Sequence, residues 1–349
     1  MRKWLVSYII ALFCLLSMQG LEHKEILLYR IVKDGKWGFI NSNGQIAVQP
    51  QFDLAGNFSE GLASVRIGGY YEGKDGYIDL TGRVAIPPQF DGSGDFSEGL
   101  GVVIKDNKYG YIDTSGKIVI ALRFDEAEAF SEGMAAIKLK GKFGYIDKTG
   151  DIRIAPQFLM TKNFHYGLAA VTILEGDKLK TGYISKSGDW VVAPKYTVGK
   201  DFSEGLAVVG LGGSAHRSEG KASLLAGDIK YNFIDTKGKV ISEQYYQGAS
   251  SFSEGLLAVK INGTWGYIDK TGKLIIKPQF EWATEFSQGL AAVQVKNKWG
   301  YIDKTGKLII KPQFETVSPF NKGLAQVTTG NASGYINKSG ELIWQLLKN

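Results

Sequence analysis

Short apolar segments and glycine-rich polar turns alternate along almost the whole chain, and their order recurs at a fixed interval. The segment Trp265–Glu281 reads WGYIDKTGKLIIKPQFE, and Trp299–Glu315 repeats it without a difference 34 residues later. Weaker copies at intervals of 34 or 38 residues extend back to Trp37 and forward to the C-terminus. A period of this length is typical of stacked supersecondary units. The pattern therefore predicts an array of repeated units.

Within one copy, the hydrophobic pattern predicts three short β-strands. The first is apolar, as in Leu290–Val293; the second is Gly300–Asp303; the third, Lys307–Ile310, carries β-branched residues that suit a pleated surface. Asn262-Gly263 predicts a two-residue hairpin turn between the first two strands, since both residues tolerate positive φ. The Pro-Gln-Phe sequence is expected to end the third strand, because proline cannot pair in the interior of a sheet.

The second and third strands are joined by Asp-Lys-Thr-Gly. Its glycine suits the left-handed position that closes a type I turn, and its aspartate can accept hydrogen bonds from the turn amides. Two aromatic rows flank the return loop, and each ring can bury about 150–250 Å². We interpret them as the contacts between neighbouring units. The rows are Phe52, Phe90, Phe124, Phe158, Tyr196, Tyr246, Phe280 and Phe314, and Phe58, Phe96, Phe130, Phe164, Phe202, Phe252, Phe286 and Phe320.

The strand count bears on how the array ends. The chain provides nine complete three-strand units, from Leu28 to Trp344, with no strand left over at either terminus. Propellers commonly close by combining strands from both termini in one blade. We therefore predict an all-β array of about nine three-stranded β-meander repeats that is open and twisted, like a solenoid. The alternative is a closed, propeller-like ring.

Two glycines in each copy show where the length varies. From the glycine after the Trp position to the glycine of Phe-Ser-Glu-Gly the spacing is 23 residues in all eight copies. From there to the next copy it is 11, except after Gly61 and Gly167, where it is 15, and after Gly205, where it is 27. All three insertions, including the long one at residues 210–230, enter the same connection. They should therefore project from one edge of the array.

The N-terminus differs from the repeats. Arg2 and Lys3 precede the uncharged apolar stretch Trp4–Met18, a pattern typical of a secretory signal peptide over residues 1–20. The stretch is short for a transmembrane helix, which needs roughly 20 residues; an uncleaved anchor is the alternative. We expect export to the periplasm, cell surface or extracellular space. The mature chain, residues 21–349, is then one repeat domain whose repeats start near residue 28, without stable membrane insertion.

Composition excludes several function classes. The only cysteine is Cys14, so the mature chain has no disulfide and no cysteine nucleophile. The net charge of +6 is mild and gives no reason to expect nucleic-acid binding. The three histidines, His23, His165 and His216, lie far apart, and no zinc or phosphate-binding motif is present. We expect no cofactor, no metal and no enzymatic activity.

Two carboxylate rows recur with the repeat, and both lie close to a turn glycine. Calcium needs six to eight oxygens at one site, and one aspartate per unit does not supply them. Hydrogen bonding to turn amides is a sufficient explanation for both rows. The rows are Asp113, Asp147, Asp235, Asp269 and Asp303, and Glu60, Glu98, Glu132, Glu204 and Glu254.

These elements together resemble the WG-containing (KWG) repeat family of bacterial proteins. The resemblance rests on Lys36–Ile40 (KWGFI), Lys298–Ile302 (KWGYI), Pro-Gln-Phe and Phe-Ser-Glu-Gly, and it covers about residues 28–349. It implies β-rich repeats in proteins that are often associated with the cell envelope, and no shared activity or catalytic residue. The departures are Asp75, Thr181 and Ser333 at the Trp position and Asn232 in place of its glycine.

The chain is therefore expected to act by binding. The favoured partner is an envelope or extracellular protein held along the insertion edge, where insertions often mark a binding face. The alternative is a carbohydrate or cell-wall binding module that uses exposed Trp and Tyr. An aromatic ledge at the Trp positions is less favoured than packing, because Asp75 and Thr181 replace the aromatic where the turn lengthens. The candidate partner-binding residues are Tyr70, Tyr71, His165, Tyr166, His216 and Arg217.

Overall fold

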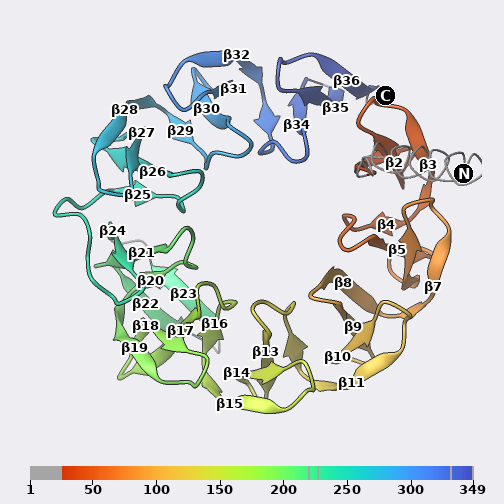
Figure 1. Ribbon diagram of the computed structural model, residues 1–349, viewed down its shortest axis with the longest axis horizontal. Coiled ribbons are helices and arrows are strands. Elements are labelled where there is room, and N and C mark those ends of the chain that lie inside the picture. Colours follow the sequence, from red (N-terminus) through yellow and green to blue (C-terminus); the bar gives the residue numbers. More distant parts are fainter. Residues whose placement is uncertain (1–25, 219–220, 226–227, 331, 348–349) are drawn as a thin grey trace, which may run out of the picture.

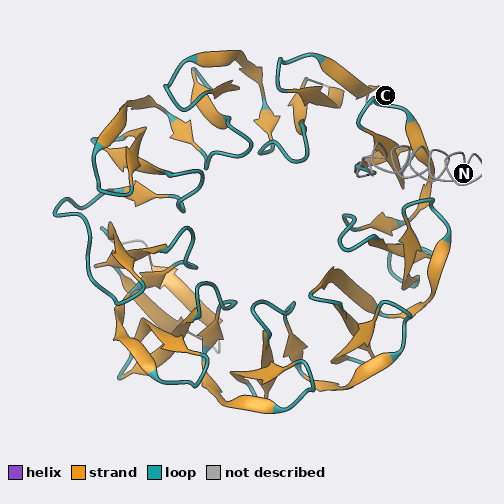
Figure 2. Ribbon diagram, viewed as in Figure 1, coloured by secondary structure: helices purple, strands orange, loops and turns teal. Residues whose placement is uncertain are grey.

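The computed structural model describes residues 26–218, 221–225, 228–330 and 332–347, and within these ranges every regular element is a β-strand. Nine small antiparallel sheets follow one another around a closed ring (Figures 1 and 2). The all-β repeat prediction is confirmed; the ring is the alternative we gave, and the open array of our first choice is not observed. The predicted signal peptide, residues 1–20, lies outside the described residues. None of the described ranges contains a helix long and apolar enough to cross a membrane.

Each regular blade has four strands, ordered from the centre of the ring to its rim (Figure 1). They are named here the inner strand, the first and second middle strands and the outer strand. The inner strands are β4 Leu54–Ala55, β8 Gly92–Ser97, β12 Glu126–Ala127, β16 Met160–Thr161, β20 Val198–Gly199, β25 Gly248–Ala249, β29 Trp282–Ala283 and β33 Thr316–Val317. The outer strands are β3 Ile46–Phe52, β7 Val84–Phe90, β11 Ile118–Phe124, β15 Ile152–Phe158, β19 Trp190–Tyr196, β28 Leu274–Phe280, β32 Leu308–Phe314 and β36 Leu342–Leu347.

The middle strands pair as long hairpins. The first middle strands are β1 Leu28–Lys33, β5 Leu62–Ile67, β9 Leu100–Lys105, β13 Met134–Leu139, β17 Leu168–Glu175, β21 Leu206–Leu211, β26 Leu256–Ile261, β30 Ala291–Val295 and β34 Leu324–Thr329. The second are β2 Lys36–Asn41, β6 Lys74–Asp79, β10 Lys108–Asp113, β14 Lys142–Asp147, β18 Lys178–Ser185, β24 Lys230–Asp235, β27 Thr264–Asp269, β31 Lys298–Ile302 and β35 Ala332–Asn337. The long insertion adds a hairpin of β22 Ser214–Ser218 and β23 Lys221–Leu225.

The structure differs from the predicted unit in two details. The inner strand lies in the segment expected to be a loop, because all inner strands except β8 have two residues, too few to show a period in the sequence. The outer strand β32 does not end before Pro-Gln-Phe but continues through Pro312 to Phe314. An outer strand is an edge strand, where a residue without an N–H donor is tolerated.

The predicted turns are confirmed. Asn262 and Gly263 both have positive φ, 48° and 86°, as a type I′ hairpin requires. Gly306 has φ 87° and donates its N–H to the Asp303 carbonyl at 3.0 Å. The Asp303 carboxylate accepts from the N–H groups of Thr305 and Lys307 at 2.9 and 3.1 Å. Hydrogen bonding within the turn therefore accounts for this aspartate.

The hydrophobic core is divided among the seams between blades. In one seam, Tyr267 and Phe280 of the seventh blade pack with Phe286 and Val293 of the eighth. The Tyr267 and Phe286 ring centroids lie 4.9 Å apart, and the Tyr267 hydroxyl donates to the Thr284 carbonyl at 2.9 Å. The same tyrosine and phenylalanine contact recurs around the ring. The aromatic rows do join neighbouring units, as predicted.

The ring closes through the same kind of contact and needs no shared strand. The Tyr335 hydroxyl in the ninth blade donates to the Arg30 carbonyl of the first blade at 2.8 Å, and the Tyr29 hydroxyl donates to the Lys322 carbonyl. Tyr29, Ile31 and Leu324 are buried together in this seam. The absence of a leftover strand therefore did not argue for an open array, because side-chain contacts are enough to hold the closing seam.

The ring has two distinct faces. One, named here the insertion face, carries the turns between the two middle strands. The opposite one, the glutamate face, carries the Phe-Ser-Glu-Gly and Asp-Lys-Thr-Gly turns. There, Glu254 of the seventh blade accepts from the Gly289 N–H of the eighth at 3.1 Å and pairs with Lys304 at 3.0 Å. The glutamates therefore cap backbone, as predicted, but they cap the next blade.

Candidate binding site

The six candidate partner-binding residues lie on two faces. Tyr70 and Tyr71 lie in the turn between β5 and β6 on the insertion face, 57% and 90% exposed, with ring centroids 4.9 Å apart. The turn is anchored, since the Arg66 guanidinium donates to the Tyr70 carbonyl at 2.9 Å and the Gly69 N–H donates to Asp53 at 2.8 Å. The longest insertion enters the equivalent turn of the sixth blade, between β21 and β24.

That insertion folds back onto the neighbouring blade. His216 and Arg217 lie on β22, which pairs with β23 along its length. His216 also pairs with Lys178, the first residue of β18, so the hairpin extends the sheet of the fifth blade. The fifth blade's own turn, the second insertion, is lengthened at this point to reach it. The structure thus joins two of the three insertions on the insertion face.

The remaining two candidates lie on the glutamate face. His165 and Tyr166 occupy the turn where most other blades have Ser-Glu, and Tyr166 is 54% exposed. The Tyr166 N–H donates to Glu132 of the previous blade at 2.6 Å. Burial raises the pKa of the Asp201 carboxyl, while the charges of His165 and Lys162 act in the opposite sense. Since the two faces lie at opposite ends of the strands, the six residues do not form one site.

The Trp positions are packed rather than presented as a ledge. Trp265 is buried in a core cluster, and Trp37 and Trp299 are partly buried against theirs. At two of the positions that lack the aromatic, buried polar groups take its place. Asp75 accepts from Arg66 at 2.6 Å, and the Thr181 hydroxyl bonds that of Thr172 at 2.9 Å.

The sixth blade departs most from the repeat, and Asn232 explains why. In other blades a glycine occupies this position because the outer strand crosses it. A Cβ on Gly300 would lie 2.4 Å from the Ile310 carbonyl oxygen. Asn232 instead donates its side-chain amide to the carbonyls of Ser242 and Gln244 at 2.8 and 3.2 Å. The segment after β24 is displaced, and only isolated bridges replace the outer strand.

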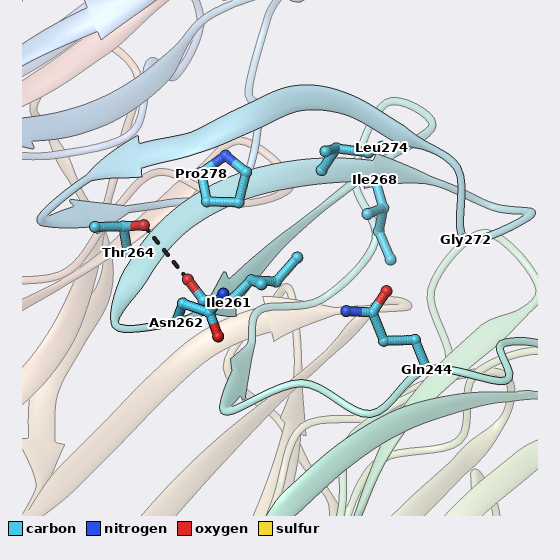
Figure 3. A pocket seen from close by; sticks show the side chains of 8 residues that line it. All are labelled: Gln244, Ile261, Asn262, Thr264, Ile268, Gly272, Leu274 and Pro278. Atoms are coloured by element: carbon cyan, nitrogen blue, oxygen red, sulfur yellow. Dashed lines mark hydrogen bonds between the residues drawn. The ribbon is translucent and has the colours of Figure 1, made fainter.

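This displacement borders a pocket of about 450 Å³ on the seventh blade (Figure 3). Gln244 extends from the sixth blade toward Ile268 and Leu274, and Pro278 forms part of the opposite wall (Figure 3). The hairpin turn Ile261–Thr264 forms its end, where the Thr264 hydroxyl lies 3.4 Å from the Ile261 carbonyl oxygen. No charged or titratable side chain lines this pocket. Its lining combines aliphatic side chains with the neutral polar side chains of Gln244, Asn262 and Thr264.

A second pocket, of about 560 Å³, lies on the inner side of blades six to nine. It is lined by residues of the inner strands β25 and β29, which face the centre of the ring (Figure 1), and by the segments that follow them. Trp265 and Trp282 lie in its wall with ring centroids 5.3 Å apart. Trp265 is buried and Trp282 is half exposed. Gly248 makes room for the Trp265 indole, because a Cβ there would lie 3.1 Å from the ring.

The charged side chains of this inner pocket each make a hydrogen bond within the protein and can make further ones. Lys200 donates to the Ala249 carbonyl at 3.0 Å, and Glu285 accepts from the Ser251 N–H at 2.8 Å. Burial lowers the pKa of Lys200, and the nearby Glu285 charge opposes this. Among the described residues, the buried Nε1–H of Trp265 has no hydrogen-bond partner.

Across the described ranges, no three side chains of His, Cys, Asp or Glu are grouped so that they could hold a metal ion. Both pockets are lined by apolar side chains and by groups that can form hydrogen bonds.

Sequence reasoning did not single out Trp282, although a signal was present. The identical copies Trp265–Glu281 and Trp299–Glu315 first differ at the next residue, which is Trp282 in one and Thr316 in the other. Similarly, Asn232 was noted as a departure, but its effect on the outer strand required knowing what crosses that position.

No curated protein matches the chain. Similar solved structures include Hsv2p of Kluyveromyces lactis, at 11% identity and TM-score 0.39, covering 72% of this chain and 95% of that one. The dihydro-heme d1 dehydrogenase NirN, in complex with DHE, matches at 14% identity and TM-score 0.45, covering 93% and 74%. Dipeptidyl peptidase 4 of Porphyromonas gingivalis matches at 11% identity and TM-score 0.47, covering 92% and 58%. At this level of similarity none of them carries an argument about this chain.

One family model matches the chain along most of its length. The WG-containing repeat model matches eight times, at residues 37–71, 76–109, 109–143, 143–175, 182–213, 233–265, 265–299 and 299–331. These segments span more than half of the chain, and each begins in the second middle strand of one blade and ends at or after the first middle strand of the next. The chain belongs to the WG-containing repeat family.

Proposed function

We propose that this protein is an exported, non-catalytic binding scaffold that holds an envelope or extracellular protein on its insertion face. The observation that carries the proposal is that all three insertions enter the turn between the two middle strands. Because every blade has the same topology, these turns end on one face of the ring. A rigid ring with loops on one face is a common arrangement for binding.

The insertions have the features of a contact surface. Tyr70 and Tyr71 are large and exposed, and Arg66 and Asp53 anchor the backbone of their turn, so less backbone entropy is lost on binding. Tyrosine is enriched at protein interfaces. The β22–β23 hairpin is fixed to the fifth blade by its pairing with β18. The apolar stretch Trp4–Met18 supports export.

The test is a pull-down from envelope extract followed by identification of the captured protein and an affinity measurement with purified partners. One altered bait has Leu211–Asp228 shortened to a two-residue turn, and another carries Tyr70→Ser and Tyr71→Ser. Tyr166→Glu is the matched control, since it restores the residue of most blades on the opposite face. We expect both altered baits to lose the partner and the control to keep it.

Equal affinity of all four baits for the captured protein would contradict the proposal, because contact would then lie elsewhere on the ring. Loss of binding in the control alone would place the contact on the glutamate face.

A further inference from the structure

The pairing of Trp265 with Trp282 occurs at a single seam among the described blades. Position 282 is the first residue of an inner strand, and no other inner strand of the described residues begins with an aromatic. The equivalent residues are Leu54, Gly92, Glu126, Met160, Val198, Gly248 and Thr316. The inner pocket that these two tryptophans line is therefore specific to this seam and does not recur with the repeat.

The packing around the two tryptophans leaves one indole face available. Trp265 lies between Gly248 of its own blade and Trp282 of the next, and only 8% of it is exposed. Trp282 is 50% exposed. An exposed indole on the wall of a pocket offers a flat apolar surface of the kind that the C–H face of a sugar ring covers.

The polar rim offers both donors and acceptors. The Lys200 ammonium has three N–H donors and uses one on Ala249. The Glu285 carboxylate uses one oxygen on the Ser251 N–H, and the hydroxyl oxygens of Ser253 and Ser287 can accept further bonds. Each sugar hydroxyl is both donor and acceptor, so this mixture can satisfy it.

Charge narrows the ligand class. The pocket holds one cation, Lys200, and one anion, Glu285, and these are close enough for Glu285 to oppose the lowering of the Lys200 pKa. A strongly charged ligand would meet a repulsive group at either sign. Two tryptophans with four hydroxyl side chains, Ser250, Ser253, Thr284 and Ser287, favour a neutral ligand rich in hydroxyls.

From these observations, we propose that the pocket between Trp265 and Trp282 binds a neutral pyranose glycan, with one sugar ring stacked on the Trp282 indole. This binding goes beyond the protein interaction on the insertion face and uses different residues. A volume of about 560 Å³ has room for more than one sugar ring.

The test is isothermal titration of the protein with cellotriose and with chitotriose. We expect saturable binding of at least one trisaccharide, and Trp282→Thr, which installs the residue of the neighbouring copy, should weaken it by about tenfold or more, the usual effect of losing a central aromatic contact. Trp190→Ile is the matched control, because Trp190 is an exposed tryptophan, 43% accessible, on the outer strand β19 where other blades have isoleucine, leucine or valine. It should bind as the unaltered protein does.

A second measurement does not depend on folding of the variants. In the ¹H–¹⁵N spectrum, the side-chain N–H signals of Trp265 and Trp282 should shift on titration, and those of Trp37 and Trp190 should not. Absence of binding by both trisaccharides, or binding that leaves the Trp282 signal and the Trp282→Thr affinity unchanged, would overturn the proposal. The pull-down on the insertion face should be unaffected by Trp282→Thr, so the two proposals fail separately.

Discussion

The Tyr335 hydroxyl donates to the Arg30 carbonyl at 2.8 Å, across 305 residues of sequence. The equivalent tyrosine in the previous blade, Tyr301, donates to the Ser318 carbonyl at the same distance, only 17 residues away. The closing seam therefore uses the same side-chain donor as an internal seam. The two hydrogen bonds have the same length, but only the bond from Tyr335 joins the two ends of the chain and so closes the ring.

This relationship predicts how the closing seam contributes to stability. Tyr335→Phe and Tyr301→Phe should each lower the free energy of unfolding by about 1 kcal/mol, the usual net value of one such hydrogen bond. Urea denaturation of both variants measures this. If the ring were open in solution, Tyr335→Phe would have no effect while Tyr301→Phe would keep its cost.

The glutamate face predicts a loss of stability in acid. Burial raises the pKa of Glu254, but hydrogen bonds from Lys304 and the Gly289 N–H outweigh it and hold the pKa below its ordinary 4.5. Glu98 and Glu204 are arranged in the same way. A depressed folded-state pKa stabilises the fold above pH 4.5, and this contribution is lost as the pH falls through the lowered value.

The variant Glu254→Gln tests this, because Gln288 shows that glutamine keeps the backbone bond, accepting from the Gly323 N–H at 2.8 Å. The variant should be less stable at pH 7 by a few tenths of a kcal/mol, since the pair is partly exposed. The gap to the unaltered protein should close as the pH drops below 4.5. The converse change, Gln288→Glu, should add acid sensitivity, because Lys338 occupies in the ninth blade the sequence position that Lys304 occupies in the eighth. Parallel pH profiles for all three proteins would contradict the assignment.

The glycine in the second middle strand predicts a steric effect. A Cβ on Gly300 would lie 2.4 Å from the Ile310 carbonyl oxygen and 2.7 Å from the Pro312 nitrogen, both backbone atoms that cannot rotate away. Gly300→Ala should therefore cost about 1–3 kcal/mol or more, as in other overpacked sites. Gly94→Ala is the control, because its Cβ would meet Val102 at an ordinary 3.6 Å. Thermal unfolding compares them, and equal midpoints would disprove the steric explanation.

The largely buried ion pair of the second blade, Arg66 with Asp75, predicts that loss of either charge destabilises the fold. Arg66 donates to Asp75 at 2.6 Å, and their side chains are only 15% and 12% exposed. Asp75→Ala leaves the guanidinium without its main partner and should cost on the order of 3 kcal/mol. The double change Arg66→Gln with Asp75→Trp copies the pair Gln294 and Trp299 of the eighth blade and should recover much of the loss. If the double variant is less stable than Asp75→Ala, the pair is not interchangeable with the aromatic.

Local chemistry allowed much of the fold to be predicted. The turns at Asn262-Gly263 and Asp303–Gly306 follow from which residues accept positive φ, and the aromatic rows follow from the repeat. The inner strand was missed because two residues such as Trp282–Ala283 show no period. The capping of Gly289 by Glu254 was predicted as a turn effect, and only the seam geometry shows that the two belong to different blades.

The sequence by itself determined the units: their strands, their turns, their common length and the single connection that accepts insertions. These depend on φ preferences and hydrophobic alternation, which act over a few residues. The tertiary structure decided that the array closes into a ring, because closure depends on the sum of small rotations between nine blades. It also decided that Trp265 meets Trp282 and that Asn232 displaces an outer strand, since both depend on which backbone or side chain packs against that position.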